Sequence, residues 1–198
     1  MKKPYWIAAG LLAIYATNLL ATTAPTATSA DEVPTAEMVA TALNLSSHVE
    51  GGYYRRSYQA DHRDPVITQS GERFLMTSIY YMLTTQSPVG HFHLNKSDIM
   101  HYYHLGDPIR YTLLHPDGKI ETFVMGADVT QGEMLQLDVK GGIWKASELS
   151  PGKHGYGLIS EAVTPGFDFA DMTLGKKPQL SKLFPQHAQL FEKLAKSE

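Results

Sequence analysis

The sequence predicts an all-β protein, a double-layered jelly roll with short helices at its N- and C-terminal periphery. From Gly51 to about Leu174, short runs rich in Tyr, Ile, Thr and Val alternate with clusters of Gly, Pro and Asp. Such runs are typical of β-strands, and many of them in series indicate a sandwich or barrel. Both faces of RFLMTSIYYML (73–83) are apolar, so we expect further segments to cover this strand from outside.

The expected strands follow one another through this region. HFHLN (91–95) and IMHYYHL (99–105) are two of them. IRYTLLHPDGKIETFVMG (109–126) predicts a hairpin that turns at Asp117-Gly118, a pair suited to a tight β-turn. The runs that continue the series are MLQLDV (134–139), IWKASEL (143–149) and GYGLISEAV (155–163).

Helical patterns stand on either side of the strands. PTAEMVATALNL (34–45) begins with Pro and Thr and has apolar residues at helical spacing. The face expected to pack on the barrel comprises Met38, Val39, Ala42 and Leu45. LSKLFPQHAQLFEKLAK (180–196) is expected to form one or two short helices, with a break at Pro185.

Residues 1–30 have the order of a secretory signal. A basic start, Met1-Lys2-Lys3, precedes an uncharged and mostly apolar run from Tyr5 to Ala21, and a linker rich in Thr, Ala and Pro follows. Cleavage after Ala30 would release residues 31–198 as a single domain. We therefore expect export, either periplasmic or secreted. The alternative is an uncleaved N-terminal membrane anchor, because the apolar run borders on spanning length.

Composition excludes several functions. The chain has 198 residues, of which 43% are hydrophobic, which suffices for one domain with a core. The net charge is −3 and no basic stripe is visible, so we expect no nucleic acid partner. The absence of cysteine excludes disulfides, thiol nucleophiles and Cys-based metal sites. Any metal ion must be held by histidine, carboxylate or water.

Four of the nine histidines lie between residues 89 and 108. Residues i and i+2 of a strand point to the same face. His91 and His93 would therefore project together and could offer two imidazoles to one ion inside a barrel. The alternative is a partly exposed strand whose polar residues face water.

Several motifs resemble the cupin superfamily. His91, His93, Asp98 and Gly106 follow the order of its first motif. The stretches VEGGYYRRSY (49–58), SIYYMLT (78–84), HLNKSD (93–98), HLGDPI (104–109) and VTPGFDF (163–169) resemble a single-domain, RmlC-like cupin family of undefined function. The resemblance covers about residues 38–175. It implies a double-stranded β-helix with an internal pocket and a homodimer, and it supplies no activity.

The departures from the family pattern suggest a metal site. Where the family has Ser-Asp-Glu-x-Trp, this chain has Ile99 in the glutamate position and His101 in the tryptophan position. Ile99 and His101 share one face of the strand. We therefore predict a three-imidazole site of His91, His93 and His101 for a divalent transition metal. Asp98 is the competing third ligand.

Lys145 stands where the second cupin motif usually has its histidine ligand. A protonated lysine does not ligate a metal ion, and a nearby dication would repel it. Three interpretations remain open. Lys145 could pair with a carboxylate such as Glu161 or Asp98, bind an anionic substrate group, or lie outside the barrel.

Other polar residues are candidates for substrate binding and catalysis. At most one of Arg55 and Arg56 can face a pocket, where it would hold a carboxylate or phosphate. The substrate-binding candidates are Arg55, Glu50 and Tyr102, and the catalytic candidates are His93, Tyr80 and Lys145. In the related sugar-nucleotide epimerases a barrel His and a Tyr act as base and acid, which His93 with Tyr80 or Tyr102 could imitate.

Three functions follow from these residues. The first is a metal-dependent enzyme that acts on a small molecule. The second is a non-catalytic periplasmic or secreted module that holds a ligand or metal. The third is a metal-free epimerase or isomerase.

Overall fold

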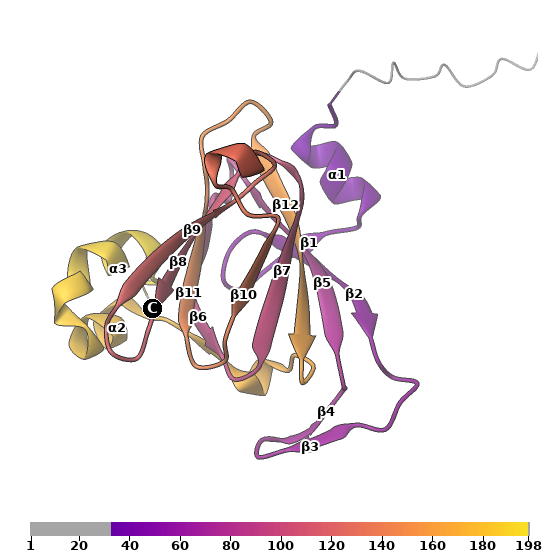
Figure 1. Ribbon diagram of the computed structural model, residues 1–198, viewed down its shortest axis with the longest axis vertical. Coiled ribbons are helices and arrows are strands. Elements are labelled where there is room, and N and C mark those ends of the chain that lie inside the picture. Colours follow the sequence, from indigo (N-terminus) through magenta and orange to yellow (C-terminus); the bar gives the residue numbers. More distant parts are fainter. Residues whose placement is uncertain (1–32, 198) are drawn as a thin grey trace, which may run out of the picture. The chain divides into compact units, whose positions relative to one another are not determined.

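Two antiparallel β-sheets face each other in the computed structural model, which describes residues 33–197 (Figure 1). The strand orders are β1-β2-β5-β12-β7-β10 in the first sheet and β13-β6-β11-β8-β9 in the second. The short helices lie outside the sheets. This confirms the predicted jelly roll with peripheral helices. The signal or anchor predicted for residues 1–30 lies outside the described residues.

Strands from all parts of the described chain contribute to the two sheets. The first sheet contains β1 (Ser46–Ser47), β2 (Tyr53–Gln59), β5 (Thr77–Thr84), β12 (Tyr156–Thr164), β7 (Asp98–Gly106) and β10 (Gln136–Val139). The second contains β13 (Met172–Leu174), β6 (Val89–Asn95), β11 (Trp144–Leu149), β8 (Ile109–Leu114) and β9 (Ile120–Met125). A separate hairpin of β3 (Val66–Thr68) and β4 (Gly71–Arg73) projects from one end (Figure 1).

Most predicted strands are present, with one interruption. The hairpin at Asp117-Gly118 joins β8 to β9, and Gly118 has the positive φ of 86° that this turn requires. The run predicted as one strand from Arg73 is divided, because β4 ends at Arg73 and β5 begins at Thr77. Between them the carbonyl of Phe74 accepts a hydrogen bond from Gly166 N, so the chain leaves the sheet there.

Helix α1 (Ala36–Ala42) packs on the outer face of the first sheet. The Thr35 hydroxyl caps it by accepting from Met38 N. Of the four residues predicted to share a face, Val39 and Leu45 pack on the sheet, but Met38 is 56% exposed and Ala42 is also exposed. The other residues that pack there are Ala36, Ala40 and Leu43. The helix has only about two turns, so a small rotation changes which residues are buried.

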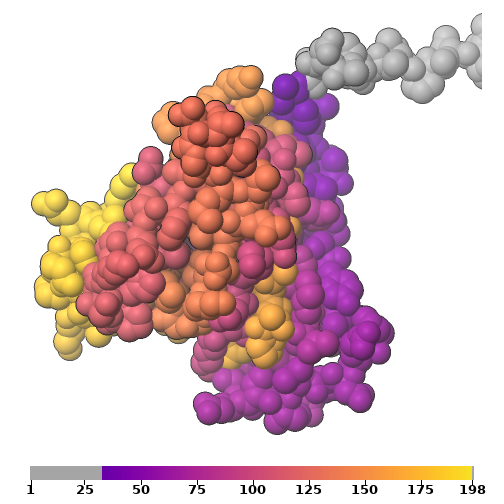
Figure 2. Space-filling model, viewed as in Figure 1, coloured from indigo at the N-terminus to yellow at the C-terminus, as the bar shows by residue number. Residues whose placement is uncertain are grey.

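The C-terminal helices cover the outer face of the second sheet (Figure 1; yellow in Figure 2). They are α2 (Lys177–Leu183), the 3-10 turn η3 (Pro185–His187) and α3 (Ala188–Leu194). The predicted break at Pro185 is confirmed. Phe92 of β6 packs edge-on against Phe191 of α3, with ring centroids 5.7 Å apart. None of the helices within residues 33–197 has the length and hydropathy needed to span a membrane.

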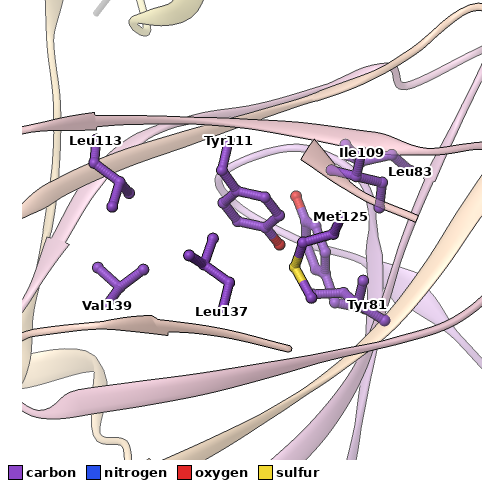
Figure 3. Packing of buried hydrophobic residues seen from close by; sticks show 9 residues of the cluster. Tyr81, Leu83, Ile109, Tyr111, Leu113, Met125, Leu137 and Val139 are labelled. Atoms are coloured by element: carbon purple, nitrogen blue, oxygen red, sulfur yellow. The ribbon is translucent and has the colours of Figure 1, made fainter. Parts of the chain in front are cut away.

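One end of the barrel interior is filled by apolar side chains (Figure 3). The buried members of this cluster are Tyr81, Leu83, Ile109, Tyr111, Leu113, Met125, Leu137, Val139 and Ile159. The inward row of β12 runs from Ile159 in this cluster to Glu161 and Val163 beyond it. The interior therefore changes from an apolar core to a polar cavity along the same strands.

The packing of Phe92 against Phe191 predicts that the C-terminal helices contribute to the free energy of unfolding. Phe92→Ala should lower the free energy of unfolding by about 3–5 kcal/mol, because it leaves a cavity beneath α3. Leu183→Ala, at an exposed position of α2, should change it by about 0.5 kcal/mol or less. Urea denaturation measures both values. Equal losses in the two variants would contradict this packing.

Candidate functional site

A cavity of about 110 Å³ lies inside the barrel, beyond the apolar core. Its polar lining consists of His48, Glu50, Arg56, Thr77, His93, Asn95 and Glu161. Its apolar lining consists of Tyr54, Ile79, Val163, Phe167, Phe169 and Met172. Arg56, Phe167 and Phe169 also border a groove on the outer surface, so the cavity opens on their side. The arrangement of polar groups at the inner end and apolar walls suits a small organic ligand.

Glu50 orients the imidazole of His93. His93 Nδ1 lies 3.0 Å from Glu50 Oε2 and 2.8 Å from the carbonyl oxygen of His91. Both neighbours are acceptors, so Nδ1 carries the proton of the neutral ring. Nε2 is then the nitrogen with a free lone pair, which is the form that can accept a proton from a ligand.

The Gly51-Gly52 turn brings Glu50 into the barrel. Gly51 has a φ of 104°, and a Cβ there would lie 2.1 Å from the carbonyl oxygen of Val89. Only glycine fits so close to β6. Burial alone would raise the pKa of Glu50, but His93 beside it outweighs burial and holds that pKa below its usual value. Glu50 is therefore ionised at neutral pH.

Lys145 connects His101 and Glu161 in the barrel wall. Its Nζ lies 2.6 Å from His101 Nε2 and 3.0 Å from Glu161 Oε1. His101 Nδ1 donates to the carbonyl of Leu137 at 3.0 Å, which leaves Nε2 to accept from the lysine. Lys145 is 2% exposed and His101 is fully buried. Of the interpretations open from sequence, the structure therefore has Lys145 paired with Glu161.

The pKa shifts agree with this arrangement. Burial lowers the pKa of His101, and the charge of Lys145 lowers it further, so the ring is neutral. Burial would raise the pKa of Glu161, but the charge of Lys145 outweighs it and holds that pKa well below its usual value. The cluster is thus an ammonium held between a carboxylate and a neutral imidazole.

These residues do not fit the predicted metal ion. The lone pair of His101 Nε2 and the Oε1 atom of Glu161, which could ligate an ion, both accept from the Lys145 ammonium. Across residues 33–197, no three His, Asp or Glu side chains are grouped so that they could hold a metal. The fixed positive charge of Lys145 would also repel a dication.

A β-bulge separates His91 from His93. Lys145 of β11 pairs with His93, but Ser147 pairs with Gly90, so β6 carries one extra residue between them. The expected alternation fails there, and the expectation that His91 and His93 share a face was wrong. The His91 ring turns outward, and its Nδ1 lies 3.3 Å from the carbonyl oxygen of Leu194 in α3.

Asp98 lies on the surface and not in the cavity. It accepts from Gly141 N at 2.9 Å and from Lys140 Nζ at 3.2 Å. Those hydrogen bonds hold the pKa of Asp98 below its usual value, with burial opposing them. The alternation of β7 places His101 inward and Asp98 outward, as expected for a regular strand.

Three further candidates also face away from the cavity. Arg55 pairs with Tyr80 across β2 and β5, and its guanidinium lies 5.6 Å from the Tyr80 ring on the outer face. Tyr102 lines a surface hollow beside Asp98. In the pairs Arg55/Arg56 and Tyr80/Tyr81, the second residue is the one that faces inward. Arg56 lines the cavity, and Tyr81 donates its hydroxyl to the carbonyl of Gly51 at 2.9 Å.

Sequence reasoning named His93, Glu50, His101 and Lys145 for the barrel interior, and the structure brings these four together there. It did not assign His48, Arg56, Asn95 and Glu161 to the lining. Strand alternation contains a signal for two of them, since Asn95 follows His93 by two residues and Glu161 stands between Ile159 and Val163. His48 lies in a loop and has no such signal.

Comparison with known proteins places the chain among cupins. A family model described as Cupin superfamily (DUF985) matches residues 37–175. The uncharacterized protein YML079W of Saccharomyces cerevisiae is 41% identical over 144 residues, which cover 67% of this chain and 71% of the relative.

Two solved structures are similar along most of the chain. A hypothetical protein from Leishmania major has a TM-score of 0.77 at 34% identity, covering 83% of this chain and all of that one. Protein SO0799 from Shewanella oneidensis has a TM-score of 0.75 at 34% identity, covering 84% of this chain and all of that one. Both structures therefore share the fold of this chain over most of its length.

The Lys145 cluster predicts a pH-dependent stability change. Lys145→Met should lower the free energy of unfolding by about 3–5 kcal/mol at neutral pH, because it leaves Glu161 buried and charged. In the wild type, the folded pKa of Glu161 lies below its ordinary 4.5, so its contribution is present above that value and lost as pH falls. In the variant, burial acts alone and favours the protonated acid, so the deficit should shrink as pH falls.

Denaturant unfolding at neutral and mildly acidic pH measures this change. The control is the double variant Lys145→Met/Glu161→Gln, which removes both charges and should recover much of the loss at neutral pH. A deficit that is independent of pH and is not reduced in the double variant would show that the charges do not interact.

The geometry at Glu50 also predicts the tautomer of His93. Nitrogen NMR of histidine-labelled protein should show the neutral ring protonated at Nδ1, because two acceptors lie beside that atom. His104, on the outer face near Tyr80, serves as a reference ring outside the cavity. A His93 ring protonated at Nε2 would contradict the orientation described above.

Proposed function

We propose that this chain, which belongs to the cupin superfamily (DUF985), binds a small molecule in its barrel cavity without a metal ion. The observation that carries the proposal is the position of Lys145 Nζ, 2.6 Å from His101 Nε2 and 3.0 Å from Glu161 Oε1. The Lys145 ammonium occupies the position from which a bound metal ion would neutralise the carboxylate of Glu161. The charge of Glu161 is therefore balanced by the chain itself.

Proton transfer to or from the ligand is the chemistry that this cavity supports best. His93 lines the cavity, and its Nε2 can take a proton from a bound molecule and later return it. The resulting imidazolium would be stabilised by the ionised Glu50, 3.0 Å from Nδ1. The role of His93 would be that of a general base, with Glu50 as its positioning residue.

Ligand binding without catalysis is the second candidate, and the position of the tyrosines favours it. A His-Tyr pair needs a tyrosine hydroxyl in the cavity, and Tyr80 and Tyr102 lie outside it. The hydroxyl of Tyr81 is engaged by Gly51, and burial raises the pKa of Tyr81 well above its usual value. The acid partners named from the sequence are thus unable to reach a ligand that contacts His93.

Metal content tests the proposal directly. After equilibration with Zn²⁺, Ni²⁺ or Mn²⁺ and gel filtration, elemental mass spectrometry should find far less than one ion per chain. Lys145→His is the positive control, because it replaces the ammonium by an imidazole beside His101 and Glu161 and should increase metal retention. About one ion per wild-type chain, reduced by His101→Ala, would overturn the metal-free proposal.

A further inference from the structure

The lining of the cavity contains an unsatisfied polar group. Asn95 is 8% exposed and lines the cavity, and its Oδ1 is buried with no hydrogen-bond partner among the described residues. A buried acceptor without a partner costs about 1–3 kcal/mol. Native structures rarely keep such a group without a ligand or water to satisfy it. Asn95 therefore indicates that the ligand carries a hydrogen-bond donor.

Two carboxylates that line the same cavity also have oxygen atoms that can accept hydrogen bonds. Glu161 binds Lys145 through Oε1, which leaves Oε2 with no hydrogen bond in the part of the chain that the structure describes. Glu50 binds His93 through Oε2, and its Oε1 has only His48 Nδ1, at 3.5 Å. With Asn95 Oδ1 and Nε2 of His93, the cavity presents four atoms that can accept hydrogen bonds from a ligand.

The charges in the cavity are unequal. Lys145 balances Glu161, and the Arg56 guanidinium donates to Gln59 Oε1 and to the carbonyl of Phe167. Glu50 has no Lys or Arg partner among the described residues, and its neighbours are the imidazoles of His48 and His93. Burial lowers the pKa of His48 more than Glu50 raises it, so His48 is neutral at neutral pH. A buried carboxylate is stabilised by a positive partner. A positively charged donor group would satisfy both the charge of Glu50 and the free acceptor of Asn95.

The apolar lining and the volume of the cavity limit the polarity and the size of the rest of the ligand. Ile79, Val163 and Met172 are apolar, and the rings of Phe167 and Phe169 lie towards the opening. An aromatic ring attracts a cation to its face, and it also packs against alkyl groups. The volume of about 110 Å³ is smaller than the roughly 150 Å³ of a cavity that holds benzene. The enclosed part of the ligand is therefore a short alkyl chain.

We infer that the cavity binds a small primary amine, whose ammonium group contacts Glu50, Glu161 and Asn95 and whose alkyl chain points towards Phe167 and Phe169. This inference rests on the proposed function, because a metal ion at the inner end would exclude the ammonium group. The ammonium of Lys145, which donates to Glu161 and His101, provides an example of the same chemistry in the adjoining wall.

The test compares three probes of equal chain length and different charge: n-butylamine, n-butanol and butyrate. Calorimetry measures their affinity for the full chain, and NMR shifts of His93 and Asn95 locate them in the cavity. Butylammonium should bind at least roughly tenfold more tightly than butanol, because charge-assisted hydrogen bonds to carboxylates are the stronger kind. Butyrate should bind most weakly.

Matched variants identify the groups responsible. Glu50→Gln keeps the shape of the side chain and removes its charge, so butylammonium should lose most of its advantage over butanol. Asn95→Leu removes the free acceptor and should weaken butylammonium binding as well. Asp98→Asn removes a surface carboxylate outside the cavity and should leave all three affinities unchanged.

The outcomes separate this inference from the proposed function. Tighter binding of butanol or butyrate at His93 and Asn95, or no binding of any probe there, would overturn the inference of an amine ligand. Neither result would contradict the proposal that the site works without a metal ion. Loss of butylammonium binding in Asp98→Asn would also overturn it, since binding would then lie on the surface. About one metal ion per chain would overturn the proposed function itself.

Discussion

The hydrogen bonds of Lys145 to Glu161 and His101 determine what the barrel can do. They place a fixed cation between two groups that could otherwise ligate a metal, at 3.0 Å and 2.6 Å. A buried carboxylate with its own ammonium is both neutralised and oriented. The second oxygen of Glu161 therefore stays available to a ligand in the cavity.

The backbone around the cavity is built to bring Glu50 to His93. The turn at Gly51 approaches β6 so closely that the carbonyl of Glu50 accepts from His91 N at 2.7 Å. The bulge in β6 turns the His91 ring towards α3 and leaves His93 facing inward. One irregularity in a strand therefore gives two histidines, one residue apart, entirely different surroundings: a helix on the outside and a carboxylate in the interior.

The jelly roll, the hairpin at Asp117-Gly118 and the inward position of His101 were predictable, because they depend on strand alternation and turn chemistry. His91 was misplaced because a bulge breaks that alternation, and nothing in HFHLN reveals one. Arg55 and Tyr80 were chosen over Arg56 and Tyr81, and alternation alone cannot say which member of a pair faces inward. The contact of Glu50 with His93 joins distant segments, which only the folded chain shows. Export and homodimerisation stay predictions.

The most direct test of the account is anomalous scattering from crystals grown with Zn²⁺, Ni²⁺ or Mn²⁺, with data collected at each metal's absorption edge. The account predicts no anomalous peak inside the barrel, with Lys145 still between His101 and Glu161 at hydrogen-bonding distance. A peak within bonding distance of His101 Nε2 or Glu161, with the Lys145 side chain turned away, would contradict it.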